Sequence, residues 1–224
     1  MNWKDSFHPY ATITIVFWSL AYVFTRLALQ VFSSFSLGFL RYLIASCTLI
    51  VIALATKMKP LRLLDLPWFF LSGAIGFFLY MICFNQGQAT VTAATGSVVI
   101  ATVPVITALQ SSTYSIFFGT LLLALFAPTA VHEISHAPAI QFFYLAVLGI
   151  GSSAIAYISW AKAFSKAKQT SQVSNYMFIT PFLTSIFGFL FAGEIPNCAT
   201  LIGGGIILTG VLIFNLSGSR HPNT

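Results

Sequence analysis

The chain is a succession of apolar stretches, each close to the length of a membrane-spanning helix, with short polar breaks between them. A bilayer core about 30 Å thick requires about 20 apolar residues per helix. Eight stretches approach this length, at residues 10–31, 34–56, 66–85, 91–110, 113–127, 139–163, 172–192 and 198–216. Only 6% of the residues are charged, so the chain cannot cover itself with polar surface. We therefore expect an all-α polytopic bundle of about eight transmembrane helices, with the lipid bilayer as its solvent.

The basic residues favour eight spans over seven. The fourth and fifth stretches are separated only by the polar cluster QSST, and one long helix there would leave seven spans. With eight spans and a cytoplasmic N-terminus, the outer loops hold Glu133 and Glu194. The inner loops and termini then hold most of the basic residues: Lys4, Lys57, Lys59, Arg62, Lys162, Lys166, Lys168 and Arg220. Because cytoplasmic loops are enriched in Lys and Arg, we expect both termini in the cytoplasm and no nucleic-acid partner for the net charge of +6.

Two halves of the chain resemble each other. A displacement of 78 residues aligns SSFSLGFLRYL, from residue 33, with SSTYSIFFGTLL, from residue 111. A displacement of 77 aligns three pairs of identical residues: Tyr80 with Tyr157, Pro104 with Pro181 and Thr107 with Thr184. Helices two to four thus correspond to helices five to seven, and an offset of three helices makes each helix run opposite to its partner. This is the inverted-topology duplication of secondary transporters.

The duplication is incomplete. The first helix has no counterpart that opens the second copy, and the last helix has none that closes the first copy. If each ancestral copy had five helices, one internal deletion of two helices near residue 110 explains the pattern. We therefore predict two repeats of four helices in place of five, at residues 1–110 and 111–224.

A proline interrupts an apolar stretch at the same position of each copy. Pro104 lies in IATVPVITALQ and Pro181 lies in FITPFLTSIF. Proline removes one backbone hydrogen bond and kinks a helix, which lipid tolerates where neighbouring groups satisfy the freed carbonyl. Breaks that recur in inverted repeats indicate a central substrate pathway and a joint, although a static kink is the alternative.

Five segments in this order resemble the EamA-type drug/metabolite transporter superfamily. They are FWSLAYVFTRLAL (17–29), LRYLIA (40–45), YMICFNQGQATVTAATGSVVIATVPVITAL (80–109), AYISWAKAFSKAKQTSQVSNYMFITPFLTSIFGFLFAGE (156–194) and LIGGGIILTGVLIF (201–214). The resemblance implies a bacterial inner-membrane protein of ten helices in two inverted repeats. It also implies export or import of small metabolites, such as amino acids or drugs, by alternating access through a central cavity. This chain lacks the family's fifth and sixth helices, so its last four helices are equivalent to family helices seven to ten.

Aromatic and polar residues near the centre of the repeats are candidates to line the pathway. They are Trp18, Tyr22, Tyr80, Tyr157, Trp160, Asn175 and Tyr176, with Arg41, Pro104 and Pro181 completing the candidate set. Aromatic rings with a few polar groups suit a small amphipathic solute. Trp and Tyr also gather at membrane interfaces, so an interfacial belt is the alternative.

Arg41 lies about two turns into the second helix, where an unpaired charge is costly. Because the middle of each span lacks an acidic residue, its partner must be a backbone carbonyl, water or a substrate carboxylate, unless the side chain reaches the headgroups. Arg26, at the end of the first helix, is better placed to reach them. The lack of acids within the spans also favours exchange over a carboxylate proton relay.

Two other interpretations of the sequence remain open. The motif HEISH matches H-E-x-x-H, in which His132 and His136 would bind zinc and Glu133 would act as general base of a membrane peptidase. The motif falls in an expected short outer loop between two prolines, with Glu194 as the nearest candidate for a third ligand. The second alternative is a truncated remnant that does not transport. For the transporter we expect no cofactor and no resident metal.

The last helix is rich in glycine at residues 203, 204, 205 and 210. Small residues let backbones approach closely in lipid. They indicate either a homodimer contact or internal packing, and the sequence does not distinguish the two.

Overall fold

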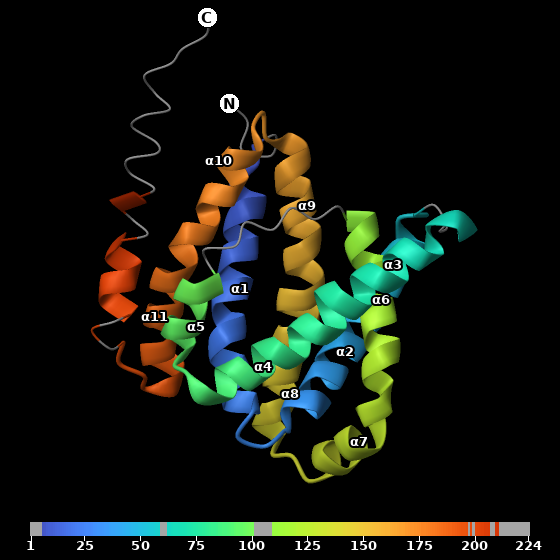
Figure 1. Ribbon diagram of the computed structural model, residues 1–224, viewed down its shortest axis with the longest axis horizontal. Coiled ribbons are helices and arrows are strands. Elements are labelled where there is room, and N and C mark those ends of the chain that lie inside the picture. The colour runs from blue at the N-terminus through green and yellow to red at the C-terminus, as the bar shows by residue number, and fades with distance from the viewer. Residues whose placement is uncertain are drawn as a thin grey trace, which may run out of the picture.

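All regular elements that the structure describes are helices (Figure 1). The computed structural model describes residues 6–58, 62–100, 109–196, 198, 200–206 and 209–210. Within them, six helical segments are long and apolar enough to cross a membrane: His8–Ala28, Ser34–Ala55, Leu63–Thr90, Ser112–Ser135, Ala139–Lys166 and Thr170–Ala192. The predicted polytopic all-α fold is therefore confirmed. The expected fourth and eighth spans lie partly outside the described residues, and so does Pro104.

Most of the spans consist of several helical elements in succession. The first two spans are α1 (His8–Ala28) and α2 (Ser34–Ala55). The third comprises η2 (Leu63–Asp65), α3 (Leu66–Gly73), η3 (Ala74–Leu79) and α4 (Tyr80–Thr90), and α5 (Ala93–Ile100) follows. The next comprises α6 (Leu109–Leu123), η4 (Ala124–Phe126) and α7 (Ala127–Ser135). The last two comprise α8 (Ala139–Ala146), η5 (Val147–Ile155) and α9 (Ala156–Lys166), then α10 (Thr170–Ser174), η6 (Asn175–Ile179) and α11 (Thr180–Ala192).

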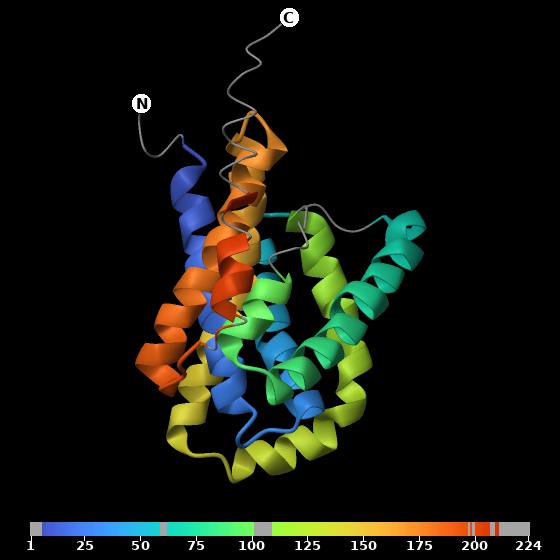
Figure 2. The same cartoon turned by 60° about the vertical axis from the view of Figure 1, so that its left-hand side comes forward.

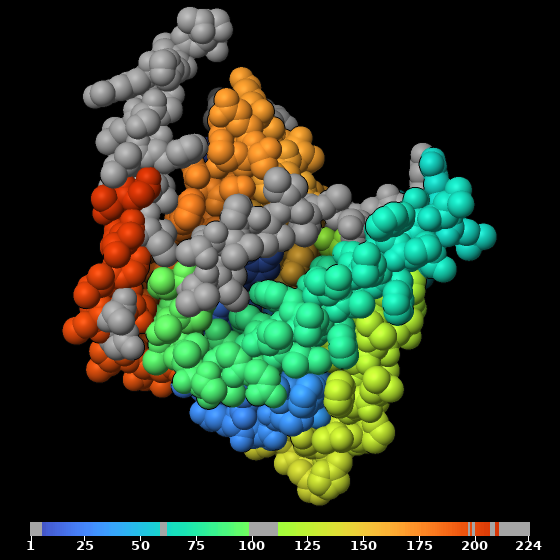
Figure 3. Space-filling view, in the orientation of Figure 1, coloured from blue at the N-terminus to red at the C-terminus, as the bar shows by residue number. Residues whose placement is uncertain are grey.

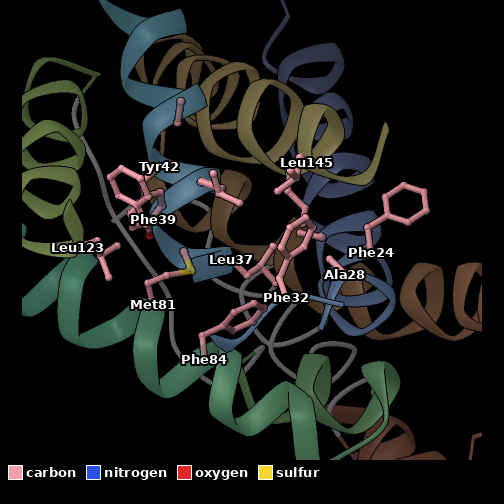
Figure 4. Close-up of a cluster of buried hydrophobic side chains, with 14 of the residues drawn as sticks. Phe24, Ala28, Phe32, Leu37, Phe39, Tyr42, Met81, Phe84, Leu123 and Leu145 are labelled. Carbon is pink, nitrogen blue, oxygen red and sulfur yellow. The ribbon is translucent and has the colours of Figure 1, made fainter. Parts of the chain in front are cut away.

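Helices α1 and α2 form the centre of the bundle. Helix α1 packs against α9, η5, α11 and α5, whereas α2 packs against α6, η5 and α4. Their side chains form the main apolar core together with residues of the third span and of α8, as Figure 4 shows for Phe24 and Ala28 of α1, Leu37 and Tyr42 of α2, and Met81 and Phe84 of α4. The two most N-terminal spans thus hold the rest of the bundle together.

The two ends of the bundle differ in charge. Lys162 and Lys166, at the end of α9, lie 5.9 and 5.6 Å from the ring of Tyr10 at the start of α1. At the opposite end, Glu133 of α7 accepts a hydrogen bond from the backbone N–H of Ser33, in the α1–α2 connection. Figures 1 and 2 both show the start of α1, the end of α9 and the start of α3 at one end, with α7 at the other. This separation matches the expected distribution of basic and acidic loops.

The two long spans that correspond under the repeat carry the same irregularity. Elements η3 and η5 are both π-helical, and a displacement of 77 residues brings η3 onto the second half of η5. A π-helical segment changes the direction of the side chains that follow and is frequent at functional sites. In both spans the segment is followed by a tyrosine of the aligned pair, Tyr80 and Tyr157.

Close glycine contacts recur between equivalent pairs of helices. A Cβ on Gly73 of α3 would lie 2.7 Å from Cβ of Phe118 in α6, and one on Gly149 of η5 would lie 2.6 Å from Cβ of Ile44 in α2. Under the repeat, α6 corresponds to α2 and the span Leu63–Thr90 to the span Ala139–Lys166, so these two helix contacts are equivalent. Small residues allow such close backbone approach in lipid. The recurrence supports the two-copy interpretation of the sequence.

The segment before residue 138 differs from its prediction. The sequence predicted a short helix at 113–127 followed by a loop, but the helical span continues to Ser135 through η4 and α7. Pro128 lies in the first turn of α7, where proline is tolerated because its missing N–H has no helical partner there. The expected HEISH loop is therefore a helix, which turns away from α6 at the end of the bundle in both views (Figures 1 and 2).

Candidate functional site

A cavity of about 460 Å³ lies within the bundle, bounded by α1, α2, the third span, α9 and the start of α11. Five of the predicted pathway residues line it: Trp18, Tyr22, Arg41, Tyr80 and Tyr157. The other lining residues were not predicted: Ala21, Tyr42, Ser72, Gly76, Phe77, Phe84, Met177 and Thr180. Figure 3 shows α3 and α4, which form one wall, running across the front of the molecule.

Seven of the thirteen residues that line the cavity are aromatic. The ring of Tyr157 lies 5.7 Å from that of Trp18 and 5.9 Å from that of Phe77. On the other side, the ring of Phe84 lies 5.5 Å from that of Tyr22 and is stacked on Tyr80 at 5.8 Å. These are ordinary separations for edge-to-face and offset-stacked pairs. The rings support one another, so the cavity has a fixed apolar wall.

Arg41 is buried at the edge of this wall, with 6% of its surface exposed. Its Nε donates to Oγ of Ser153 at 2.8 Å, and its Nη2 donates to Oγ of Ser152 at 3.1 Å. Its guanidinium carbon lies 5.8 Å from the centre of the Phe84 ring. The sequence predicted a carbonyl, water or substrate as partner, but two hydroxyls of η5 hold the side chain. The sequence does not reveal these two partners because the serines lie about 110 residues from Arg41 in the chain.

Several polar atoms around the cavity have no partner among the described residues. The third nitrogen of the guanidinium, Nη1 of Arg41, makes no hydrogen bond, and neither does Oγ1 of Thr180. Both atoms are buried, and such groups are uncommon in folded proteins because an unmade hydrogen bond costs free energy. Both residues line the cavity, so an apolar wall stands beside unpaired hydrogen-bonding groups, which is typical of a small-molecule site.

Four predicted residues lie outside the cavity wall. Trp160 is fully buried behind Trp18, with ring centres 5.1 Å apart. Tyr176 lies beside His8 at the end of the bundle, and Asn175 is the first residue of η6. Pro181 lies in the first turn of α11, directly after η6, so the chain changes its helical winding at the predicted break. Pro104, the fifth, is outside the described residues.

The cavity residues that the sequence did not reveal follow helical spacing from those that it did. Ser72, Gly76 and Tyr80 are four residues apart, and Phe77 and Phe84 flank Tyr80 at three and four residues. Residues at these spacings share one face of a helix. Tyr80 therefore identifies the lining face of the third span. The residues at these spacings that share this face form this wall of the cavity.

A second polar cluster joins three helices at the acidic end of the bundle. Arg26 of α1 forms an ion pair with Glu194, which follows α11, and donates to the backbone carbonyls of Gln88 and Val91. Glu194 also accepts from the backbone N–H of Ala93 at 3.0 Å. Arg26 was expected to reach the lipid headgroups. The structure instead shows an internal tie between α1, the α4–α5 connection and the end of α11.

We predict that Glu194→Gln lowers the stability of the protein in detergent by about 1.5 to 3 kcal/mol, because the ion pair and a charge-assisted hydrogen bond are lost together. Thermal unfolding of the purified variant measures this effect. Glu133→Gln is the matched control, since Glu133 accepts from one backbone N–H and forms no ion pair among the described residues. Equal unfolding temperatures for the two variants would contradict the role assigned to the pair.

The HEISH motif has the spacing of a zinc site without its surroundings. His132 and His136 lie near each other at the exposed end of α7, with ring centres 4.9 Å apart. Glu133 is occupied by the N–H of Ser33, and Glu194 is paired with Arg26. Over the described part of the chain, no three His, Cys, Asp or Glu residues gather as a metal would require. The geometry gives the peptidase interpretation no support.

Comparison with known proteins gives two matches to one family. The sequence model of the EamA-like transporter family matches residues 8–114 and again residues 109–216. These two matches fall on the two halves that the internal repeat defines. No solved structure matches the chain.

Curated relatives are similar over most of the chain. A probable terminal-alkyne amino-acid exporter of Streptantibioticus cattleyicolor is 23% identical, over 91% of each chain. An uncharacterized transporter of Bacillus subtilis, YdfC, is 23% identical over 89% of this chain and 88% of its own length. An uncharacterized transporter of Archaeoglobus fulgidus is 26% identical over 90% of this chain and 72% of its own. The first match extends over 271 positions, more than the 224 residues here, so that relative has residues that this chain lacks.

Proposed function

Because the chain belongs to the EamA-like transporter family, we propose that it carries small amphipathic metabolites through the aromatic cavity by alternating access. Its relatives are named transporters and exporters, so the chain is a multi-pass membrane transporter and not an enzyme. The observation that carries the proposal is the position of the cavity, where α1, α2 and both irregular long spans meet.

The movement that we propose uses the irregular helices as joints. Elements η3 and η5 lie beside the cavity in the spans Leu63–Thr90 and Ala139–Lys166, and η6 ends at Ile179, directly before the lining residue Thr180 and Pro181. Weakened helical hydrogen bonding at these three places allows the segments on either side to tilt. Tilting of the two long spans in opposite senses would open the cavity first to one side of the membrane and then to the other, as inverted repeats do in secondary transporters.

The substrate class follows from the cavity wall. Aromatic rings with a few polar atoms suit a small solute that has an apolar body. The name of the Streptantibioticus relative supports amino acids as a class to test. The lining residues that the structure describes include no acid, so we propose exchange or facilitated movement, without proton relay through a carboxylate in the membrane.

We also propose a location and an orientation. The bacterial relatives support the inner membrane. Lys162 and Lys166 lie at the same end as the start of α1, and the positive-inside bias places this end in the cytoplasm. We therefore propose that the start of α1 is cytoplasmic, and, from the distribution of basic residues in the sequence, that the C-terminus is cytoplasmic too.

The test is flux into proteoliposomes that contain the purified full chain. The panel consists of apolar and aromatic amino acids, related carboxylates, and neutral and cationic drugs of similar size. We expect saturable, protein-dependent uptake of at least one solute, and faster uptake when the same solute is loaded inside. Absence of flux for every solute, while a full-length family relative in the same vesicles transports, would refute the proposal and favour a non-transporting remnant.

A further inference from the structure

Arg41 has the properties of an anion-binding group, since it is buried and positively charged and has one unpaired N–H donor. We propose that Nη1 of Arg41 binds the carboxylate of the transported solute, so that the substrate class is a monocarboxylate with an apolar or aromatic body. This inference rests on the proposed transport function and names the group that selects the substrate. It concerns the described residues of the cavity alone.

Hydrogen bonds to η5 fix the orientation of the guanidinium. Hydroxyls of Ser153 and Ser152 accept from Nε and Nη2, at 2.8 and 3.1 Å. Ser152 in turn donates to the backbone carbonyl of Leu148 at 2.7 Å, which fixes the direction of its lone pairs. The side chain is held on its η5 side, and Nη1 is left as the unpaired donor of a residue that lines the cavity. Because two nitrogens are already held by hydrogen bonds, the side chain loses little freedom when the third binds a ligand, and such preorganisation favours binding.

Among the residues that the structure describes, no acid balances the charge of Arg41. Of the acidic residues in the described chain, Glu194 is paired with Arg26, Glu133 accepts from Ser33, and Asp65 lies in η2 at an end of the third span. None of them lines the cavity. An unpaired charge within a membrane span is costly, and it is characteristic of substrate and ion sites. A bound anion would remove this cost, whereas a bound cation would increase it.

The surroundings of the free nitrogen favour a carboxylate with one charge. A single guanidinium balances one negative charge, and a doubly charged phosphate would leave its second charge among the rings of Phe84, Tyr22 and Trp18. Burying an unpaired charge against apolar groups is strongly unfavourable. The same rings offer a flat surface to an apolar or aromatic body. The cavity of about 460 Å³ limits this body to a small molecule.

Other polar atoms of the wall can bind the rest of the solute. Oγ1 of Thr180 is unpaired, and Tyr22, Tyr80 and Tyr157 line the same cavity with their hydroxyl-bearing rings. These groups can accept from an ammonium or a hydroxyl on the same solute. They would widen the class to amino and hydroxy acids, while the carboxylate on Arg41 stays common to all.

The test compares 3-phenylpropionate with its neutral amide, 3-phenylpropionamide, which has nearly the same shape. Binding to the purified full chain is measured by competition and by the shift in thermal unfolding, and flux is measured in proteoliposomes. We expect the wild-type protein to prefer the acid by about tenfold or more, since the lost contact is a charge-assisted hydrogen bond. Arg41→Gln should remove this preference by weakening the acid alone, and Arg41→Lys should retain part of it.

Ser153→Ala provides a variant that keeps the charge and removes one anchor. We expect it to weaken acid binding less than Arg41→Gln does, and to leave amide binding unchanged. If Arg41→Gln does not fold, as judged by size-exclusion chromatography, Ser153→Ala and the wild-type comparison decide the question. Equal affinity of the wild-type protein for acid and amide overturns the inference, and so does a folded Arg41→Gln variant that still prefers the acid.

The outcome separates this inference from the proposed function. If the wild-type protein prefers the acid in binding but shows no flux for any solute in the panel, transport is refuted and the carboxylate site stands. If solutes cross the membrane but acid and amide do so equally well, transport stands and the carboxylate site is refuted.

Discussion

Gly76→Trp is expected to reduce transport to the level of protein-free vesicles while leaving the fold intact. Gly76 lines the cavity, and a Cβ at this position would meet only Oγ of Ser72, at the ordinary contact distance of 3.9 Å. The backbone therefore has room for a side chain, and we expect an indole at this lining position to extend into the cavity. An indole there occupies the space that the solute needs. Flux of the best substrate of the wild-type protein, measured in proteoliposomes, tests this expectation.

The matched control for this experiment is Gly87→Trp. Gly87 belongs to α4 of the same span, and a Cβ there meets nothing within 4 Å, but it does not line the cavity. We expect normal flux for Gly87→Trp and similar unfolding temperatures for both variants. Wild-type flux in a folded Gly76→Trp variant would mean that the solute does not cross through this cavity.

Gly149→Ala is expected to destabilise the protein, although alanine is the better helix former. A Cβ at this position would lie 2.6 Å from both Cβ and Cγ2 of Ile44 and 3.1 Å from the backbone oxygen of Arg41. Helix α2 would have to move away from η5, and overpacking of this kind costs about 1 to 3 kcal/mol. The gain from helix propensity, about 1 kcal/mol at most, is smaller. The displacement would also stretch the bonds from Arg41 to Ser152 and Ser153.

Thermal unfolding in detergent measures this effect, with Gly87→Ala as control. A new methyl group on Gly87 meets no neighbour, so alanine there should leave stability unchanged or raise it slightly. We expect Gly149→Ala to unfold at a lower temperature than the wild-type protein. If Gly149→Ala unfolds at the same temperature as Gly87→Ala, the contact between α2 and η5 has room for a methyl group, and the account of this contact is wrong.

The membrane-spanning fold could be predicted because lipid imposes a strict rule on sequence. Every apolar stretch must be long enough to cross and must satisfy its backbone as a helix. The predicted bounds 10–31 and 34–56 therefore lie within three residues of those of α1 and α2. The rule gives no signal where polar residues continue a helix beyond its apolar stretch. Helix α7, with its HEISH motif, was mistaken for a loop for this reason.

The cavity was predicted in part, by residue type and repeat position. The pair Tyr80 and Tyr157 was found because two equivalent positions carry the same side chain, and both residues line the cavity. The sequence groups Trp160 with them, but the structure places it behind Trp18 and fully buried, because a packed aromatic one turn further along α9 has the same sequence signal as a lining residue. The partners of Arg41 depend on how α2 packs against η5, and no local pattern of sequence records this packing.

The central claim is that the cavity opens in turn to each side of the membrane. It is tested by Ala21→Cys, because Ala21 lines the cavity on α1 and cysteine adds little volume. The free cysteines Cys47, Cys83 and Cys198 are exposed and are first replaced by serine. A membrane-impermeant maleimide is then applied to one side of sealed vesicles of known orientation. We predict reaction from both sides, slowed in each case by the transported solute, whereas reaction from one side only, at a rate that the solute does not change, would contradict the account.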